Sequence, residues 1–97
     1  MSVVFASEAL RDLELIGDWI AADSPRRAVS YVRELRMRAR SLNAWPYRYP
    51  ASGSDPRIRR APYGAYNIHY VVLNDRVLIW RILHSAMLFE VVWPGPE

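Results

Sequence analysis

The fold of this chain is decided by the stretch YNIHYVVLNDRVLIWRILH, which occupies residues 66–84. From Tyr66 to Val72, large apolar side chains alternate with Asn67 and His69, and this period of two residues predicts a strand with one buried face. Asn74-Asp75 then favours a tight hairpin turn. Val77 to Leu83 is nearly continuous in apolar residues, which is typical of a central strand.

Shorter elements flank this hairpin. Arg57 to Ala61 predicts a short basic strand, and Leu88 to Trp93 predicts a last edge strand before a Pro-Gly-Pro sequence ends regular structure. The residues from Asn43 to Pro56 are rich in proline and contain Gly53, so they predict a loop. Near the start of the chain, Val3 to Phe5 predicts another short strand.

Two amphipathic helices are predicted between the first strand and the loop. Ser7 is placed to cap a helix that begins at Glu8, and Ser24-Pro25 marks the start of a second helix. Apolar residues recur at helical spacing in both: Ala9, Leu13, Ile16 and Ile20 in the first, and Ala28, Val32, Leu35, Ala39 and Leu42 in the second. The opposite side of the first helix is expected to carry Arg11, Asp12, Glu14 and Asp18.

The pattern as a whole predicts an α+β fold of order βααβββ, an antiparallel sheet with a helical hairpin packed on one face. The 97 residues suffice for a single domain over residues 1–97, and 52% of them are hydrophobic, which is ample for a core. No apolar run is long enough to span a membrane and the first residues lack a basic signal-peptide region, so we expect a cytoplasmic protein.

The composition also limits the chemistry. The absence of cysteine excludes disulfides, thiol catalysis and thiolate-bound zinc, and two histidines are too few for a convincing metal site, so we expect no cofactor and no metal. All 13 basic residues are arginine, whose planar fork suits carboxylates and phosphates.

Charge is distributed unevenly along the chain. Residues 1–23 hold one arginine and five acids, net −4, whereas residues 24–60 hold ten arginines and two acids, net +8. Residues 61–97 have a net charge of −1. The modest overall charge of +3 therefore conceals a strongly basic middle, which indicates an anionic partner for that surface.

Three arginines of the predicted strands, Arg59, Arg60 and Arg81, are candidates to converge on one face of the sheet and bind phosphate. His84, at the end of its strand, is a candidate general acid or base. A ribonuclease would use Arg60, Arg81 and His84 in these roles. The alternatives are structural: Arg81 pairs with an acid of the first helix or with a partner's carboxylate, and the His84 ring bonds the backbone.

Two further features remain open at this point. The segment from Met87 to Trp93 is apolar, and it either packs on the domain's own core or leaves a partner site exposed. The basic second helix has no Asn or Gln before Asn43, so we expect no direct sequence-specific DNA binding.

The order of these motifs resembles the ParE branch of the RelE/ParE toxin–antitoxin superfamily. The resemblance covers roughly residues 3–84. It rests on Asp23-Ser24-Pro25 with Ala28, Pro50 and Gly53, Arg60, Tyr66-x-Ile68-x-Tyr70 and Ile82-Leu83-His84.

The resemblance implies a type II toxin that inhibits DNA gyrase without catalysis and is neutralised by a ParD-like antitoxin. An extended, often acidic tail of such an antitoxin wraps around the toxin. Two alternatives remain: a RelE-like ribosome-dependent mRNA endoribonuclease, and an inactive member that only binds its antitoxin.

We expect an acidic antitoxin tail to bind the basic surface of residues 24–60 and the open face of the sheet. On the second helix, Arg33, Arg36 and Arg40 fall on one side at positions i, i+3 and i+7. Together with Arg60 and Arg81 from the sheet, they are the predicted antitoxin-binding residues.

Overall fold

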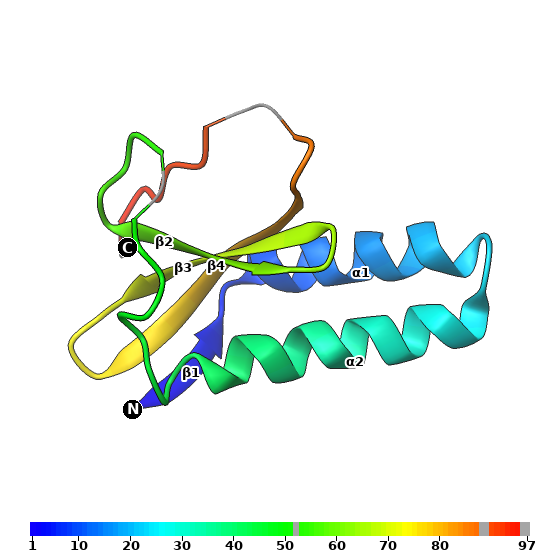
Figure 1. Cartoon of the computed structure of the whole chain (residues 1–97), viewed down its shortest axis with the longest axis horizontal. Helices are drawn as coiled ribbons and strands as arrows, with labels where there is room; N and C mark the ends of the chain where they lie inside the picture. Colours follow the sequence, from blue (N-terminus) through cyan, green and yellow to red (C-terminus); the bar gives the residue numbers. More distant parts are fainter. Residues whose placement is uncertain (52, 88–89, 96–97) are drawn as a thin grey trace.

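The computed structural model describes residues 1–51, 53–87 and 90–95. In chain order, its elements are β1 (Ser2–Phe5), α1 (Ser7–Ala21), α2 (Pro25–Ser41), β2 (Ile58–Tyr63), β3 (Tyr66–Val72) and β4 (Arg76–His84). The predicted order βααβββ is confirmed. Figure 1 shows α1 and α2 lying side by side as one long hairpin.

The sheet has the strand order β1-β4-β3-β2. β4 is central and pairs antiparallel with β3, which pairs antiparallel with β2, as predicted. The sheet as a whole is mixed, however, because β1 runs parallel to β4, from Ser2 opposite Arg76 to Phe5 opposite Ile79. The direction of β4 is fixed by the two antiparallel hairpin connections before it, and the long helical crossover allows β1 to join it in parallel.

The two helix starts differ in their capping. Ser24 caps α2 as predicted, since its hydroxyl accepts a hydrogen bond of 3.2 Å from the Arg27 backbone N–H. The prediction for Ser7 is wrong: α1 begins at Ser7 itself, and Ala6 is the capping residue without a side-chain bond. The Ala6 N–H continues the β1–β4 ladder to the carbonyl of Ile79 at 2.9 Å, so the helix starts directly after this extended residue.

The main core lies between the helical hairpin and one face of the sheet. The predicted apolar side of each helix is confirmed, with Leu13 and Leu35 at most 1% exposed. They pack with Ile68, Ile79 and Ile82 from β3 and β4. Burying such side chains contributes about 1.5–3 kcal/mol each.

Asp12 was expected on the polar side of the first helix, and that expectation is wrong. The residue is 7% exposed, beside Leu13 at the border of the buried side. Its carboxylate is held by β4, as described below.

Two short turns set the strand pairing. The Asn74-Asp75 turn is confirmed, with the Leu73 N–H donating to the Arg76 carbonyl at 2.8 Å. Between β2 and β3, Gly64 has a φ of +56°, a left-handed conformation that favours glycine. A Cβ atom at Gly64 would lie 2.5 Å from the Tyr31 hydroxyl, so the turn sits directly against α2.

A second apolar cluster lies on the outer face of the sheet, away from the helices. Ile58 of β2 and Val71 of β3 are covered there by Trp93, which is 6% exposed. Of the predicted edge strand, Leu88 and Phe89 lie outside the described residues, and residues 90–93 form no strand. Side-chain hydrogen bonds hold this segment in place of a strand ladder. Figure 1 shows it returning to the start of β2.

No helix in the described ranges is long and apolar enough to cross a membrane.

Candidate functional site

The five predicted antitoxin-binding arginines lie on two different surfaces. Arg33, Arg36 and Arg40 are on α2, where Arg36 is half-buried and the other two are exposed. Arg60 and Arg81 belong to β2 and β4, on the other side of the core.

One of these α2 arginines, Arg36, lines a groove between the two helices. The groove joins two hollows, of about 630 and 360 Å³, which share Glu14 and Arg36. Its other lining residues come from both helices: Ser7, Glu8, Leu10, Arg11, Leu13, Gly17, Ala28, Val29 and Val32. The smaller hollow is mainly apolar, and Val29 there remains 61% exposed, whereas the larger hollow holds Glu8 and Glu14 together with Arg11 and Arg36.

Phe5 lies under two of the α2 arginines. The guanidinium groups of Arg36 and Arg40 lie 5.9 and 5.5 Å from the centre of its ring. Such cation–π contacts order long arginine side chains without neutralising their charge. The surface therefore presents positive charge beside exposed apolar atoms.

Arg81 has an internal partner. Its Nε and Nη2 atoms donate to the two carboxylate oxygens of Asp12 at 2.8 and 3.0 Å, which confirms the ion pair with an acid of the first helix. The Ile82 backbone N–H also donates to Asp12, at 2.9 Å. These bonds raise the pKa of the Arg81 guanidinium.

The position of Asp12 follows from the shortness of β1. Pairing between β1 and β4 ends at Ile79, whereas β4 continues to His84. The backbone of β4 beyond that point needs another partner on this side, and the Asp12 carboxylate supplies one for Ile82. Asp12 was missed as a key residue because helical periodicity alone places it next to the polar side.

His84 is also engaged structurally. Its Nδ1 accepts a hydrogen bond of 3.0 Å from the Ala86 N–H, so the backbone alternative for this ring is confirmed. The ring packs edge-on against Tyr66, with centroids 5.2 Å apart.

Arg59 does not join Arg60 and Arg81. Because successive side chains of a strand point to opposite faces, Arg59 turns toward the helix side, where it donates to the Tyr49 carbonyl at 2.7 Å. Its guanidinium also lies 4.8 Å from the centre of the Tyr47 ring. The predicted convergence of three arginines is therefore wrong.

His69 lies between the remaining two arginines. It is paired with Arg60 on one side and Arg81 on the other, and it is 9% exposed. Burial, followed by the charges of Arg60 and Arg81, lowers its pKa to about 4. The sequence did place this residue on the face opposite Ile68, but nothing in the pattern indicated its burial.

Asp55 holds the C-terminal segment against the outer face of the sheet, close to the start of β2. This carboxylate accepts from the Arg57 Nε and Nη2 atoms at 2.9 and 2.7 Å and from the Trp93 N–H at 3.2 Å. Arg57 in turn donates to the Trp93 carbonyl at 2.6 Å. The Arg57 guanidinium holds the pKa of Asp55 well below its usual range. Within the segment from Met87 to Trp93, Val91 and Trp93 pack on the domain itself, whereas Met87 and Val92 are 49% and 56% exposed, so each alternative left open by the sequence holds for part of the described residues.

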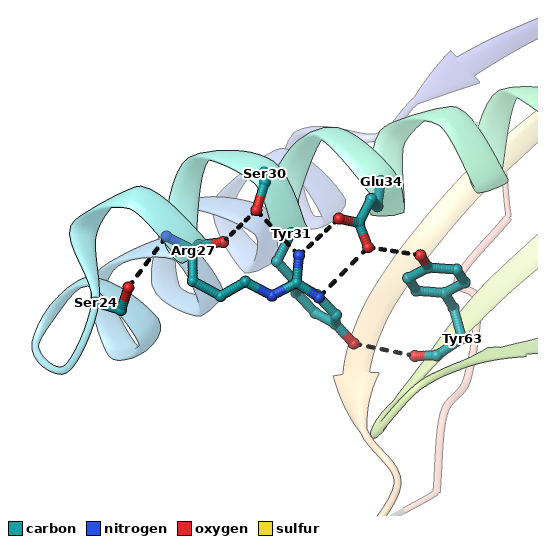
Figure 2. A network of polar contacts seen from close by, with 6 residues as sticks. All are labelled: Ser24, Arg27, Ser30, Tyr31, Glu34 and Tyr63. Carbon is teal, nitrogen blue, oxygen red and sulfur yellow. Dashed lines mark hydrogen bonds and ion pairs between the residues drawn. The ribbon is translucent and has the colours of Figure 1, made fainter.

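A polar network fixes the β2–β3 hairpin on α2 (Figure 2). Glu34 accepts from Arg27 at 2.6 Å and from the Tyr63 hydroxyl at 2.7 Å. The Tyr31 hydroxyl donates to the Tyr63 carbonyl at 3.3 Å. Arg27 lowers the pKa of Glu34, so the single acid of α2 is used within the domain.

Among the described residues, no group of three or more acidic or histidine side chains is arranged to hold a metal ion.

Fold and surfaces together define a small α+β domain that presents an arginine-rich helix, a groove beside it and a partly closed sheet face. The chain belongs to the ParE toxin family of type II toxin–antitoxin systems, parDE, whose family model matches residues 3–89. The resemblance drawn from the sequence is therefore confirmed.

Solved structures agree on the fold. The chain is similar to the chromosomal ParDE toxin–antitoxin system from P. aeruginosa, with a TM-score of 0.76 and 19% identity, covering 87% of this chain and 95% of that one. It is also similar to the RelBE2 toxin–antitoxin complex from Mycobacterium tuberculosis, with a TM-score of 0.60 and 25% identity, covering 87% of this chain and 96% of that one. No curated protein matches the chain.

Proposed function

We propose that this ParE-family toxin acts by binding DNA gyrase and is neutralised by a ParD-like antitoxin. The observation that carries the proposal is the internal engagement of Arg81 and His84. Asp12 binds Arg81 and the Ala86 N–H binds His84, so two of the three candidate ribonuclease residues already have structural partners.

Ribonucleolytic cleavage needs a base, an acid and a cation around one phosphate. Arg60 remains available, but His84 packs on Tyr66 and Arg59 faces the helix side. This arrangement supports a toxin that binds its target over one that cuts RNA. A RelE-like mRNA endoribonuclease is the second candidate, because Arg60 and Arg81 share a strand row with His69.

The target is tested by adding the purified protein to DNA gyrase with plasmid DNA. The proposal expects loss of supercoiling and accumulation of cleaved DNA, both abolished by prior addition of the antitoxin. The same protein added to translating ribosomes is expected to leave mRNA intact. Ribosome-dependent cleavage that disappears in Arg60→Ala and His84→Ala would instead establish the endoribonuclease, and inactivity in both assays would identify a member that only binds its antitoxin.

The groove between α1 and α2 is the antitoxin site that we propose for Arg33, Arg36 and Arg40. Apolar anchors of an antitoxin segment match the smaller, mainly apolar hollow, and its acidic side chains match the arginines of α2. Exposed arginines mainly accelerate association and make it depend on salt.

The test measures antitoxin association for the triple variant Arg33→Ala, Arg36→Ala, Arg40→Ala at low and high salt. We expect association to slow by about tenfold at low salt, with a much smaller effect at high salt. Arg48→Ala is the matched control, because Arg48 is exposed on the loop after α2, away from the groove, and its guanidinium lies 5.2 Å from the centre of the Tyr49 ring. If the triple variant and the control associate with the antitoxin at the same rate and with the same salt dependence, the antitoxin does not bind at this groove.

A further inference from the structure

Three neighbouring strands bring Arg60, His69 and Arg81 into one row. In the strand register, Arg60 is opposite His69, and His69 is opposite Arg81. Cross-strand neighbours have Cβ atoms about 5 Å apart, so the three side chains start within reach of one small group. Arg60 and His69 stand on the outer face, because the residues next to them, Ala61 and Ile68, belong to the core under the helices.

The His69 ring has an unused nitrogen. Its Nδ1 is enclosed and has no hydrogen-bond partner among the described residues. An enclosed N–H without an acceptor costs more than an enclosed lone pair without a donor. We therefore assign the proton to Nε2, which makes Nε2–H the donor that the imidazole offers to a ligand.

The charges around His69 determine its chemical form. Arg60 of β2 and Arg81 of β4 lower its pKa together with burial, and Asp12 of α1 acts in the opposite direction. With a pKa of about 4, the imidazole is neutral at pH 7. The row then offers a neutral N–H donor between two guanidinium groups, and one of these, Arg60, has no hydrogen-bond or ion-pair partner among the described residues.

We infer that Arg60 and His69, flanked by Arg81, form a receptor for one carboxylate group on a segment of the antitoxin. This inference rests on the proposed function for the identity of the partner. An arginine fork and an imidazole N–H supply three donors in a row, which suits the two oxygens of an Asp or Glu side chain. Arg81 contributes the positive charge of its guanidinium beside His69, since two of its N–H donors already bind Asp12.

The local charge favours a carboxylate over a nucleic acid. Two arginines against Asp12 leave one net positive charge, which one carboxylate balances. The outer face beyond this row is apolar at Ile58 and Trp93, and Arg57 is paired with Asp55. A nucleic-acid strand would need several cations along its path.

The first test follows the His69 ring nitrogens and the Arg60 side chain by NMR during titration with acetate, inorganic phosphate and a short RNA at constant ionic strength. We expect acetate to shift both residues and to raise the pKa of His69. Arg60→Gln and His69→Phe should each weaken acetate binding at least threefold. His69→Gln, which retains an N–H donor, should restore part of it, and Arg48→Gln should bind as the parent does. A larger response to phosphate or RNA than to acetate would overturn the carboxylate assignment, as would no response at all.

The second test measures antitoxin affinity for the same variants. Losing a hydrogen bond to a charged group weakens affinity by about tenfold, and we expect this loss in Arg60→Gln and His69→Phe but not in Arg48→Gln. Neutralising one antitoxin acid should remove the sensitivity to Arg60→Gln. Tight antitoxin binding that is indifferent to both substitutions would overturn this inference and leave the proposed function intact. No antitoxin binding by the parent protein would overturn the proposed function, and the carboxylate receptor would then lack its assigned partner.

Discussion

Asp12 and Arg81 lie 69 residues apart in the chain and meet in a two-pronged ion pair at the edge of the sheet. The Asp12 side chain is 8% exposed and that of Arg81 is 31% exposed. The pair joins the first helix to the central strand where β1 no longer covers it. Removing one partner would leave a largely buried charge without compensation.

We therefore expect Asp12→Ala to lower the free energy of unfolding by about 2–4 kcal/mol. The Ile82 N–H loses its acceptor in the same variant. Chemical denaturation of Asp12→Ala, Arg81→Ala and the double variant gives the coupling energy, which should be about 2 kcal/mol or more. The exposed pair Asp75–Arg76 is the matched control and should change stability by less than about 1 kcal/mol. A coupling no larger than that of the control pair would contradict the structural role.

Gly64→Ala should be more costly than Gly53→Ala. Both glycines have positive φ, which strains alanine by about 1–2 kcal/mol, but only Gly64 would place its Cβ 2.5 Å from the Tyr31 hydroxyl. We expect thermal denaturation to show a larger fall in melting temperature for Gly64→Ala. Adding Tyr31→Phe to Gly64→Ala should recover the part of the fall in melting temperature that is due to the contact with the Tyr31 hydroxyl. If the two alanine variants melt alike, the hairpin does not press on α2 as described.

Acid should destabilise the protein through His69. Its pKa is about 4 when folded and 6.5 in the unfolded chain, so the unfolded state binds the proton first as the pH falls. The contribution of neutral His69 to the free energy of unfolding is fully present above pH 6.5. It is lost as the pH falls from 6.5 to about 4, which lowers the free energy of unfolding by about 2–3 kcal/mol. The measurement is the free energy of unfolding against pH in buffers free of carboxylate and phosphate. His69→Phe should have a flatter profile in this window, and an unchanged slope would contradict the assignment.

Asp55→Asn should loosen the C-terminal segment. The substitution removes the charge that pairs with Arg57 and weakens the bond to the Trp93 N–H. We expect faster hydrogen exchange at the Trp93 amide and a lower melting temperature. Because the pKa of Asp55 is lowered, the bonds from Asp55 to Arg57 and to the Trp93 N–H should persist in the parent protein at pH values where an ordinary Asp is protonated. Asp75→Asn, at an exposed site, is the control and should exchange as the parent does.

Local patterns were sufficient for most of the fold. The alternation from Tyr66 to Val72 marks β3 to the residue, and the helical spacing of apolar residues identifies both buried helix faces. The parallel pairing of β1 was not predictable, because a four-residue strand contains no signal for the direction of its partner. The Ser7 cap failed for a related reason: the β1 ladder extends through Ala6 and determines where the helix starts.

The site was harder to predict than the fold. The sequence does suggest Arg60 and Arg81, but not that Asp12 would occupy Arg81, because that contact joins residues far apart in the chain. Burial of His69 and the covering of the outer face by Trp93 likewise depend on tertiary packing. Residue type and spacing therefore locate candidate cations, whereas their availability depends on neighbours that only the folded chain supplies.

The central place of β4 has a consequence for how the protein is made. β1 is synthesised before β4 and has no partner strand until Arg76–Ile79 leave the ribosome, and Ile82 of the core emerges later still. A nascent chain that has not reached β4 can form the helical hairpin but cannot close the sheet against it. The core of this domain is therefore completed only after β4 has left the ribosome.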